Sequence, residues 1–133
     1  MRFLDANVVI RYLTEDDPAK AARCGRLFNK VGRGEETLVT HPLVLAEVVW
    51  VLTGVYRLAK ERVVDALVEL LSLDDLLLDD KEGALSALGL FRTKPIDFVD
   101  AYTAIWMQAK GLNQIHSYDT DFDLLTGLQR VEP

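Results

Sequence analysis

The sequence predicts an α/β fold in which a parallel sheet of short strands carries helices on both faces. Short strand-like segments alternate with longer helical patterns along the chain, and this alternation is typical of parallel α/β sheets. One segment, Leu76-Leu77-Leu78, is wholly apolar, as an interior strand covered on both faces should be. The 133 residues contain no repeat and no long linker, so we expect a single domain over residues 1–133.

Five short segments are predicted to be strands. They are residues 2–4, 37–39, 76–78, 114–117 and 128–131, the last of them at a sheet edge. Residues 92–95 are predicted to form a loop and residues 118–123 an acidic turn.

Capping residues mark where the first helices begin. Asp5-Ala6-Asn7 follows the first strand and suits a helix start. Asp17 is predicted to be the N-cap of a second helix, with Pro18 at its first position. That helix runs to about Val31 and ends at the glycines that follow.

Three further helices follow in the second half of the chain. One covers residues 59–73, and the next is capped by the acidic pair at 79–80. The last covers residues 97–110 and has Gly111 as its C-terminal stop. Trp50 and Trp106 are predicted to be packing residues, with a dimer surface as the alternative for one of them, and His116 is predicted to be a hydrogen-bonded core residue.

The segment 42–52 is predicted to be a buried helix that contains one acid. Pro42 suits the first turn, and the run from Leu43 to Leu52 is apolar on nearly all sides. Glu47 is the one formally charged side chain in this run. A buried carboxylate must be paired, protonated or bound to metal. The alternative is that Glu47 lies at a helix edge and reaches water.

Charge and composition exclude several classes of protein. Half of the residues are hydrophobic and 27% are charged, no apolar run is long enough to span a membrane, and the first residues lack a secretory pattern. The lone cysteine, Cys24, is predicted to be a core residue, and we expect a cytoplasmic protein. The net charge of −6 argues against broad electrostatic binding of nucleic acid, although a local basic patch or a cation-covered acidic site remains open.

Four carboxylates are placed near one edge of the predicted sheet. Asp5 follows the first strand, Glu47 lies on the helix after the second, and Asp119 follows the fourth. Ligands bind at this edge in open parallel sheets. Asp100, in the first turn of the helix that begins at Asp97, reaches the same edge only if the fold brings that turn to it. Taken singly, each acid also suits a helix start or a solvated turn.

A single pocket would explain all four acids together. Clustered carboxylates repel one another and stay ionised only when cations neutralise them. No cysteine or histidine joins the set, so its oxygen ligands favour Mg²⁺ or Mn²⁺. Such a site is suited to phosphodiester hydrolysis by metal-activated water.

These residues resemble the motifs of the PIN-domain family. The motifs are Asp5-Ala6-Asn7, Thr40 with Ala46-Glu47-Val48, Asp97-Phe98-Val99-Asp100-Ala101, and Ser117-Tyr118-Asp119-Thr120-Asp121-Phe122. Their order and spacing, from Met1 to about Val131, are similar to those of the VapC-type ribonuclease toxins of prokaryotic toxin–antitoxin pairs.

The resemblance implies a three-layer α/β/α sandwich and a metal-dependent endoribonuclease that leaves 5′-phosphate and 3′-hydroxyl ends. The residues implied to be catalytic and metal-binding, directly or through water, are Asp5, Glu47, Asp100 and Asp119. Asn7 and Thr40 would support the site through hydrogen bonds, and Asp121 is a candidate further acid. A homodimer and a cognate antitoxin that blocks the site are also implied.

Arg11, Arg92 and Lys94 are the candidates for contacts to RNA phosphates, and each could equally be a solvated surface charge.

Two alternatives belong to other classes of protein. A PIN-like chain that has lost turnover would act as a binding module through a partner protein, and the presence of all four acids argues against it. A phosphatase with Asp5 as nucleophile usually needs a second Asp two residues later, and that position is Asn7.

Overall fold

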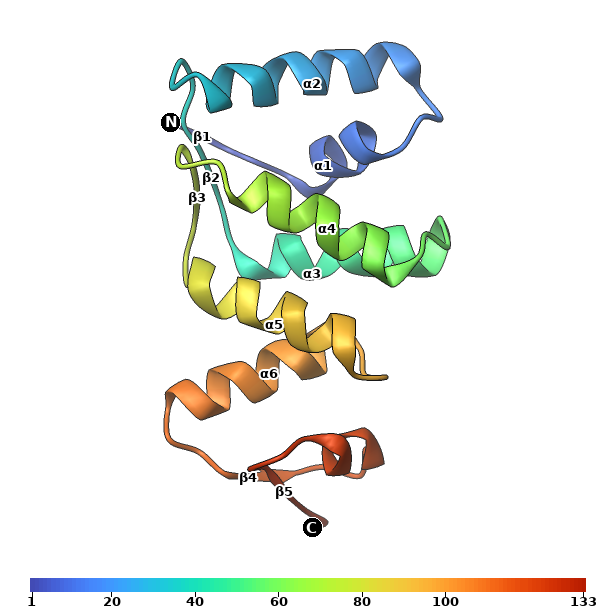
Figure 1. The fold of residues 1–133 in the computed structure, drawn as a ribbon, viewed down its shortest axis with the longest axis vertical. Helices are drawn as coiled ribbons and strands as arrows, with labels where there is room; N and C mark the ends of the chain where they lie inside the picture. The colour runs from blue at the N-terminus through green and yellow to red at the C-terminus, as the bar shows by residue number, and fades with distance from the viewer. The chain divides into compact units, whose positions relative to one another are not determined.

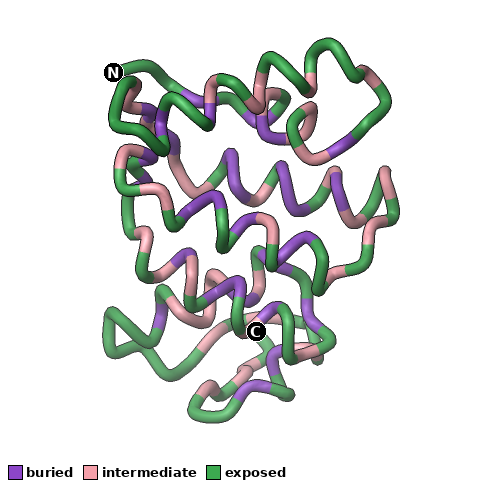
Figure 2. Tube along the Cα trace, turned by 45° about the horizontal axis from the view of Figure 1, so that its top comes forward, coloured by how far each residue is buried: buried purple, intermediate pink, exposed green.

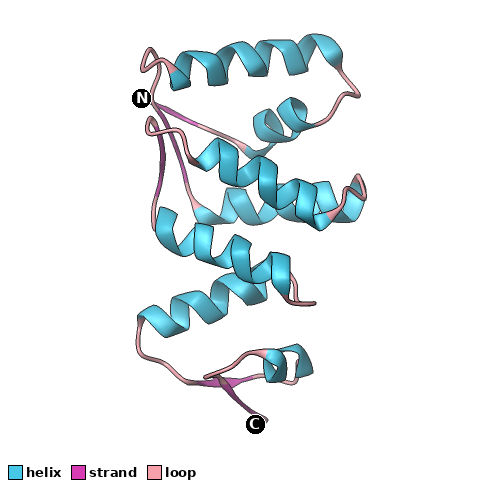
Figure 3. Ribbon diagram, viewed as in Figure 1, coloured by secondary structure: helices cyan, strands magenta, loops and turns pink.

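The computed structural model describes all residues from Met1 to Pro133 (Figure 1). Most residues lie in helices, and each strand is two or three residues long (Figure 3). In chain order the elements are β1 (Arg2–Phe3), α1 (Ala6–Leu13), α2 (Pro18–Gly32), β2 (Leu38–Thr40), α3 (Pro42–Trp50), the π-helix η1 (Val51–Val55), α4 (Lys60–Leu71), β3 (Leu76–Leu78), α5 (Lys81–Thr93), α6 (Phe98–Ala109), β4 (Gln114–His116), the 3₁₀-helix η2 (Thr120–Leu124) and β5 (Gln129–Val131).

The chain forms two compact units, residues 1–81 and residues 82–133. In the first unit β1, β2 and β3 form a parallel sheet with β2 in the middle. In the second unit β4 and β5 pair in parallel. Every strand pairing is parallel and helices connect the strands, which confirms the predicted α/β class. The pairing into a three-stranded and a two-stranded sheet was not predicted, because strands this short do not indicate which edges meet.

The core of the first unit lies between its sheet and its helices. Leu38 and Leu76 on neighbouring strands are almost completely buried, as are Val48 on α3 and Leu67 on α4. Buried positions, purple in Figure 2, recur along the helices. In α4 they are Val63, Val64, Leu67, Leu70 and Leu71, the spacing of an amphipathic helix. At about 25 cal/mol per Å² of apolar surface removed from water, this burial is the main stabilising term of the unit.

Helix α2 begins where the capping residues predicted. The Asp17 side chain accepts a hydrogen bond from the backbone N–H of Lys20 at 3.0 Å, and Pro18 occupies the first helical position. The cap satisfies one of the backbone N–H groups that a helix start leaves free.

Helix α3 is less buried than its composition predicts. Its start at Pro42 is confirmed, and Val44, Leu45, Val48 and Val49 are buried. Leu43 and Trp50, however, are 77% and 69% exposed, and Glu47 is exposed between them. These three residues recur at i, i+4 and i+7, so they share one face of the helix. The helix therefore buries one side rather than its full circumference.

The second unit has its core between α5 and α6. Leu88 and Ala101 are fully buried, and the rings of Phe91 and Phe98 meet edge to face with centroids 6.1 Å apart. Gly111 has a φ of 71° just beyond α6, the left-handed conformation that glycine adopts at a helix end.

Four predictions about the second half of the structure or about packing are wrong. Residues 92 and 93 belong to the last turn of α5 rather than to a loop. His116 is exposed, because β4 has only β5 as a partner strand. Trp50 and Trp106 are 69% and 46% exposed rather than packed inside.

None of the helices has the length and hydrophobicity that crossing a bilayer requires.

Candidate metal centre

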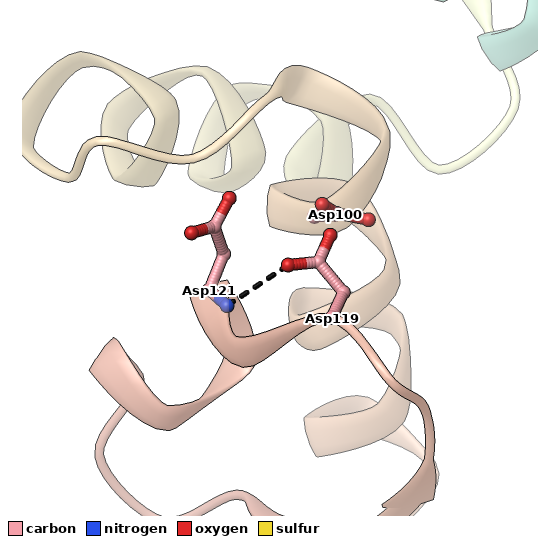
Figure 4. A group of neighbouring side chains, drawn as sticks. All are labelled: Asp100, Asp119 and Asp121. Atoms are coloured by element: carbon pink, nitrogen blue, oxygen red, sulfur yellow. Dashed lines mark hydrogen bonds between the residues drawn. The ribbon is translucent and has the colours of Figure 1, made fainter.

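Three carboxylates of the second unit meet at one point. Asp100 lies in the first turn of α6, and Asp119 and Asp121 lie at the start of η2. One oxygen of each falls within 4.8 Å of the others (Figure 4). Two of these acids, Asp100 and Asp119, belong to the predicted catalytic set, and Asp121 is the predicted further acid.

Helix capping holds Asp100 in place. The side chain of Asp97 accepts a hydrogen bond from the backbone N–H of Asp100 at 2.9 Å. This bond fixes the first turn of α6, whose free N–H groups favour negative charge nearby. The plainer interpretation of Asp97 and Asp100, an ordinary helix start, is therefore confirmed, and it is compatible with the predicted role of Asp100 in the site.

A similar cap holds the other two acids. The hydroxyl of Ser117 accepts a hydrogen bond from the backbone N–H of Asp119 at 2.9 Å. The side chain of Asp119 in turn accepts one from the backbone N–H of Asp121, also at 2.9 Å. One oxygen of Asp119 is thereby occupied, and the chain is turned so that Asp121 faces the same point (Figure 4).

Arg130 braces this acidic turn from β5. Its guanidinium donates to Asp123 at 3.0 and 3.2 Å, to Glu132 at 2.8 Å and to the backbone carbonyl of Ser117 at 3.1 Å. These contacts raise the pKa of Arg130 and fix the turn at both ends. We did not single out Arg130 from the sequence. A signal was present in the sequence. Arg130 is the only lysine or arginine after Lys110, and the segment before it holds three acids at alternate positions, Asp119, Asp121 and Asp123.

The clustering has a direct electrostatic consequence for Asp100. Burial, followed by the negative charges of Asp97 and Asp119, raises the pKa of the Asp100 carboxyl from 3.8 to about 6. A cation placed among the three carboxylates would oppose all of these effects. Carboxylate oxygens at this spacing are the ligands that Mg²⁺ and Mn²⁺ prefer, so the residues present fit such an ion.

The other predicted site residues lie in the first unit. Asp5 is the N-cap residue of α1 and follows β1, and its side chain makes no capping hydrogen bond. Thr40 ends β2, is buried, and donates through its hydroxyl to the backbone carbonyl of Leu4 at 3.0 Å. This bond holds the backbone immediately before Asp5. Asn7 is exposed in the first turn of α1.

Glu47 is an exposed residue in the middle of α3. The prediction that Glu47 is buried is therefore wrong, and the alternative, in which Glu47 lies at a helix edge and reaches water, is confirmed. Its assignment to the site stays a prediction that rests on the family resemblance.

The predicted phosphate contacts have mixed surroundings. Arg11 donates to Asp16 at 3.3 Å, a long contact with both side chains partly exposed. Arg92 is in the last turn of α5, and Lys94 follows that helix. The contacts of Arg11, Arg92 and Lys94 with RNA stay a prediction.

The raised pKa of Asp100 predicts how stability should vary with pH without divalent cations. The native carboxyl holds its proton up to about pH 6, and the unfolded one only to about pH 3.8. The stabilisation is present below about pH 3.8 and is lost as the pH rises through about 6. Relative to Asp100→Asn, the parent should lose thermal stability between pH 4 and 7.5, as measured by melting curves in EDTA. Asp74→Asn is the control, and a parent–variant difference independent of pH would contradict the prediction.

Comparison with known proteins identifies the family. The model of the PIN domain matches residues 2–128, across both units. Among solved structures, the chain is similar to VapC20 of Mycobacterium tuberculosis, a toxin that cleaves the sarcin–ricin loop, with 22% identity over 100% of both chains and a TM-score of 0.42. No curated protein gives a significant match. Because the family model spans nearly the whole sequence, the chain belongs to the PIN-domain family.

Proposed function

We propose that this protein is a Mg²⁺- or Mn²⁺-dependent endoribonuclease that acts as the toxin of a toxin–antitoxin pair. The observation that carries the proposal is the approach of Asp100, Asp119 and Asp121 to within 4.8 Å, in a chain that belongs to the PIN-domain family. The toxin role is supported by the order of the sequence motifs, which resembles that of VapC-type toxins. Fold alone would not establish activity. The three carboxylates add a site that could bind a divalent cation, which the proposed reaction requires.

The proposed site residues have two roles, binding of the ion and positioning of the residues that bind it. Asp100 and Asp119 would hold the ion directly or through water, and Asp121 is a further acid beside these two. The family resemblance assigns Asp5 and Glu47 to the same ion. When bound there, a divalent cation would supply a Lewis acid for the phosphodiester and for the attacking water. In-line attack of water at phosphorus breaks the bond to the 3′ oxygen, leaving a 3′-hydroxyl and a 5′-phosphate. Thr40 fixes the backbone before Asp5, and Asn7 offers an amide in the first turn of α1.

The proposed partners are RNA, a cognate antitoxin and a second copy of the chain. The homodimer is supported by exposed apolar side chains on α3 and η1, where Leu43, Trp50 and Val55 are each more than 60% exposed. Large apolar residues gathered in this way on a surface favour association with another protein.

Removal of divalent cations should abolish RNA cleavage. Without a cation, the acids that would hold it repel one another and provide no electrophile. We expect purified protein in EDTA to leave a labelled RNA intact, and excess Mg²⁺ or Mn²⁺ to restore cleavage. Ca²⁺ serves as a control for simple charge neutralisation. Undiminished cleavage in EDTA would overturn the metal mechanism, and binding without cleavage in any cation would favour the non-catalytic binding module.

Replacing single acids by amides should abolish cleavage while the fold is kept. Asp5→Asn, Glu47→Gln and Asp100→Asn each remove one negative charge without changing side-chain size, and each should lower kcat/KM at least about 100-fold. Without metal, Asp100→Asn should be as stable as the parent or more stable, because a repelling charge is gone. Asp5→Asn and Glu47→Gln should keep the fold, because both side chains are exposed. Asp74→Asn, on an exposed acid outside the set, is the control for charge. A Glu47→Gln variant with full activity would remove Glu47 from the site.

Leu43 and Trp50, which flank Glu47 on the exposed face of α3, should contribute to the homodimer contact and leave Glu47 open at its edge. Leu43→Ser combined with Trp50→Ser should halve the mass measured by light scattering, because both side chains lose apolar area that a partner would cover. The thermal stability of the monomer should change little, since both residues are exposed. Trp106→Ser, on another exposed tryptophan, is the control. A parent that is monomeric at high concentration would contradict the dimer.

A further inference from the structure

One helix of this acidic protein carries basic side chains and no acidic ones. Helix α2 carries Lys20, Arg23, Arg26 and Lys30 and contains no acid, although the whole chain has a net charge of −6. Neighbouring cations three or four residues apart repel one another on a helix. A helix with this composition is therefore stabilised when an anion covers it.

Part of this helix lines a pocket that it shares with α1. Asn7, Val8 and Arg11 of α1 face Lys20, Arg23 and Cys24 of α2 across a space of about 360 Å³. Asn7 and Val8 precede Arg11 by four and three positions, and Lys20 precedes Arg23 and Cys24 by three and four positions, so each set occupies one face of its helix. We call this space the α1–α2 basic pocket.

The cations of the pocket are only partly neutralised by the protein. Arg23 has no ion-pair partner and is exposed. Lys20 lies 3.8 Å from Asp17, and Arg11 lies 3.3 Å from Asp16. Asp17 is also engaged as the cap of α2, and Asp16 also accepts from Tyr56 and Thr14. The pocket therefore keeps a net positive charge.

The pocket begins next to a proposed catalytic residue. Asn7 and Val8 lie in the first turn of α1, whose N-cap is Asp5. The backbone carbonyl of Asp5 accepts a hydrogen bond from the N–H of Val8 at 3.2 Å. A chain of phosphates bound in the pocket would thus pass within one helical turn of Asp5.

We infer that the α1–α2 basic pocket binds the phosphate backbone of the RNA substrate, with Arg23, Arg11 and Lys20 as its contacts. This inference rests on the proposed ribonuclease function and names two residues, Lys20 and Arg23, beyond the contacts predicted from the sequence. Guanidinium groups pair with phosphate oxygens through two parallel hydrogen bonds. An RNA strand is favoured over an acidic protein segment, because a protein of net charge −6 repels RNA elsewhere and needs local cations to hold it.

The test compares two charge reversals on the same helix. Arg23→Glu alters the pocket, and Arg26→Glu, three residues later, removes an exposed arginine that does not line it. Both new glutamates lie between two cations of α2, so both variants should fold, which melting curves check. Binding of a fluorescein-labelled 20-nucleotide RNA of mixed sequence is measured by anisotropy, with Ca²⁺ in place of Mg²⁺ to suppress turnover.

We expect Arg23→Glu to raise the Kd for RNA at least 10-fold and Arg26→Glu less than 2-fold. The slope of log affinity against log salt should become shallower by about 0.7 in Arg23→Glu, the value for one lost phosphate contact on a single strand. In Mg²⁺, KM should rise and kcat should stay near that of the parent, because the pocket positions the strand and does not touch the reacting bond.

Equal effects of the two variants would overturn the inference, since general charge rather than the pocket would then attract RNA. Unchanged RNA binding in Arg23→Glu would also overturn it and would leave the pocket to an acidic protein segment. A failure of the proposed function is distinct from both outcomes, because in that case the parent itself would not cleave RNA in Mg²⁺.

Discussion

Repulsion among close carboxylates is the constraint on which the candidate site depends. Asp100, Asp119 and Asp121 bring oxygens within 4.8 Å of one another. Burial, followed by the negative charges of Asp97 and Asp119, raises the pKa of Asp100 to about 6. Hydrogen bonds keep the acids together: Asp97 caps α6, Asp119 caps η2, and the Arg130 side chain holds the turn through Asp123. Local capping thus holds a charge arrangement that would otherwise spread apart, and a divalent cation is the ligand that would relieve it.

Two local charge clusters of opposite sign lie in different units of the chain. The second unit gathers acids at the start of α6 and η2, whereas α2 in the first unit carries four cations and no acid. A phosphodiester substrate needs both kinds of surface: oxygen ligands for a cation at the reacting phosphate, and basic side chains for the phosphates on either side. The net charge of −6 does not reveal these two clusters, so total charge alone does not argue against the proposed binding of RNA.

Local features could be predicted from the sequence, and long-range ones could not. The strand at 76–78, the Asp17–Pro18 helix start and the capping role of Asp97 follow from short-range rules on apolar runs and caps, and all are found in the structure. The exposure of Glu47 was missed because the composition of α3 does not reveal that Leu43, Glu47 and Trp50 share an open face. Arg130 was missed because two of its partners, Asp123 and Ser117, lie seven and thirteen residues before it and are brought to it only by the pairing of β5 with β4. The pairing of the strand edges could likewise not be predicted, because a strand of three residues does not indicate its partner strand.

The ionisation of Asp100 tests the central claim most directly. Carbonyl-carbon NMR of selectively labelled protein can follow this carboxyl from pH 3 to 8, without divalent cations and with saturating Mg²⁺. The account predicts a midpoint near the raised pKa of about 6 without metal, and a midpoint below the usual 3.8 once Mg²⁺ is bound, because a cation favours the ionised form. A midpoint near 3.8 that Mg²⁺ does not move would mean that the three acids neither repel strongly nor bind the ion, and would contradict the account.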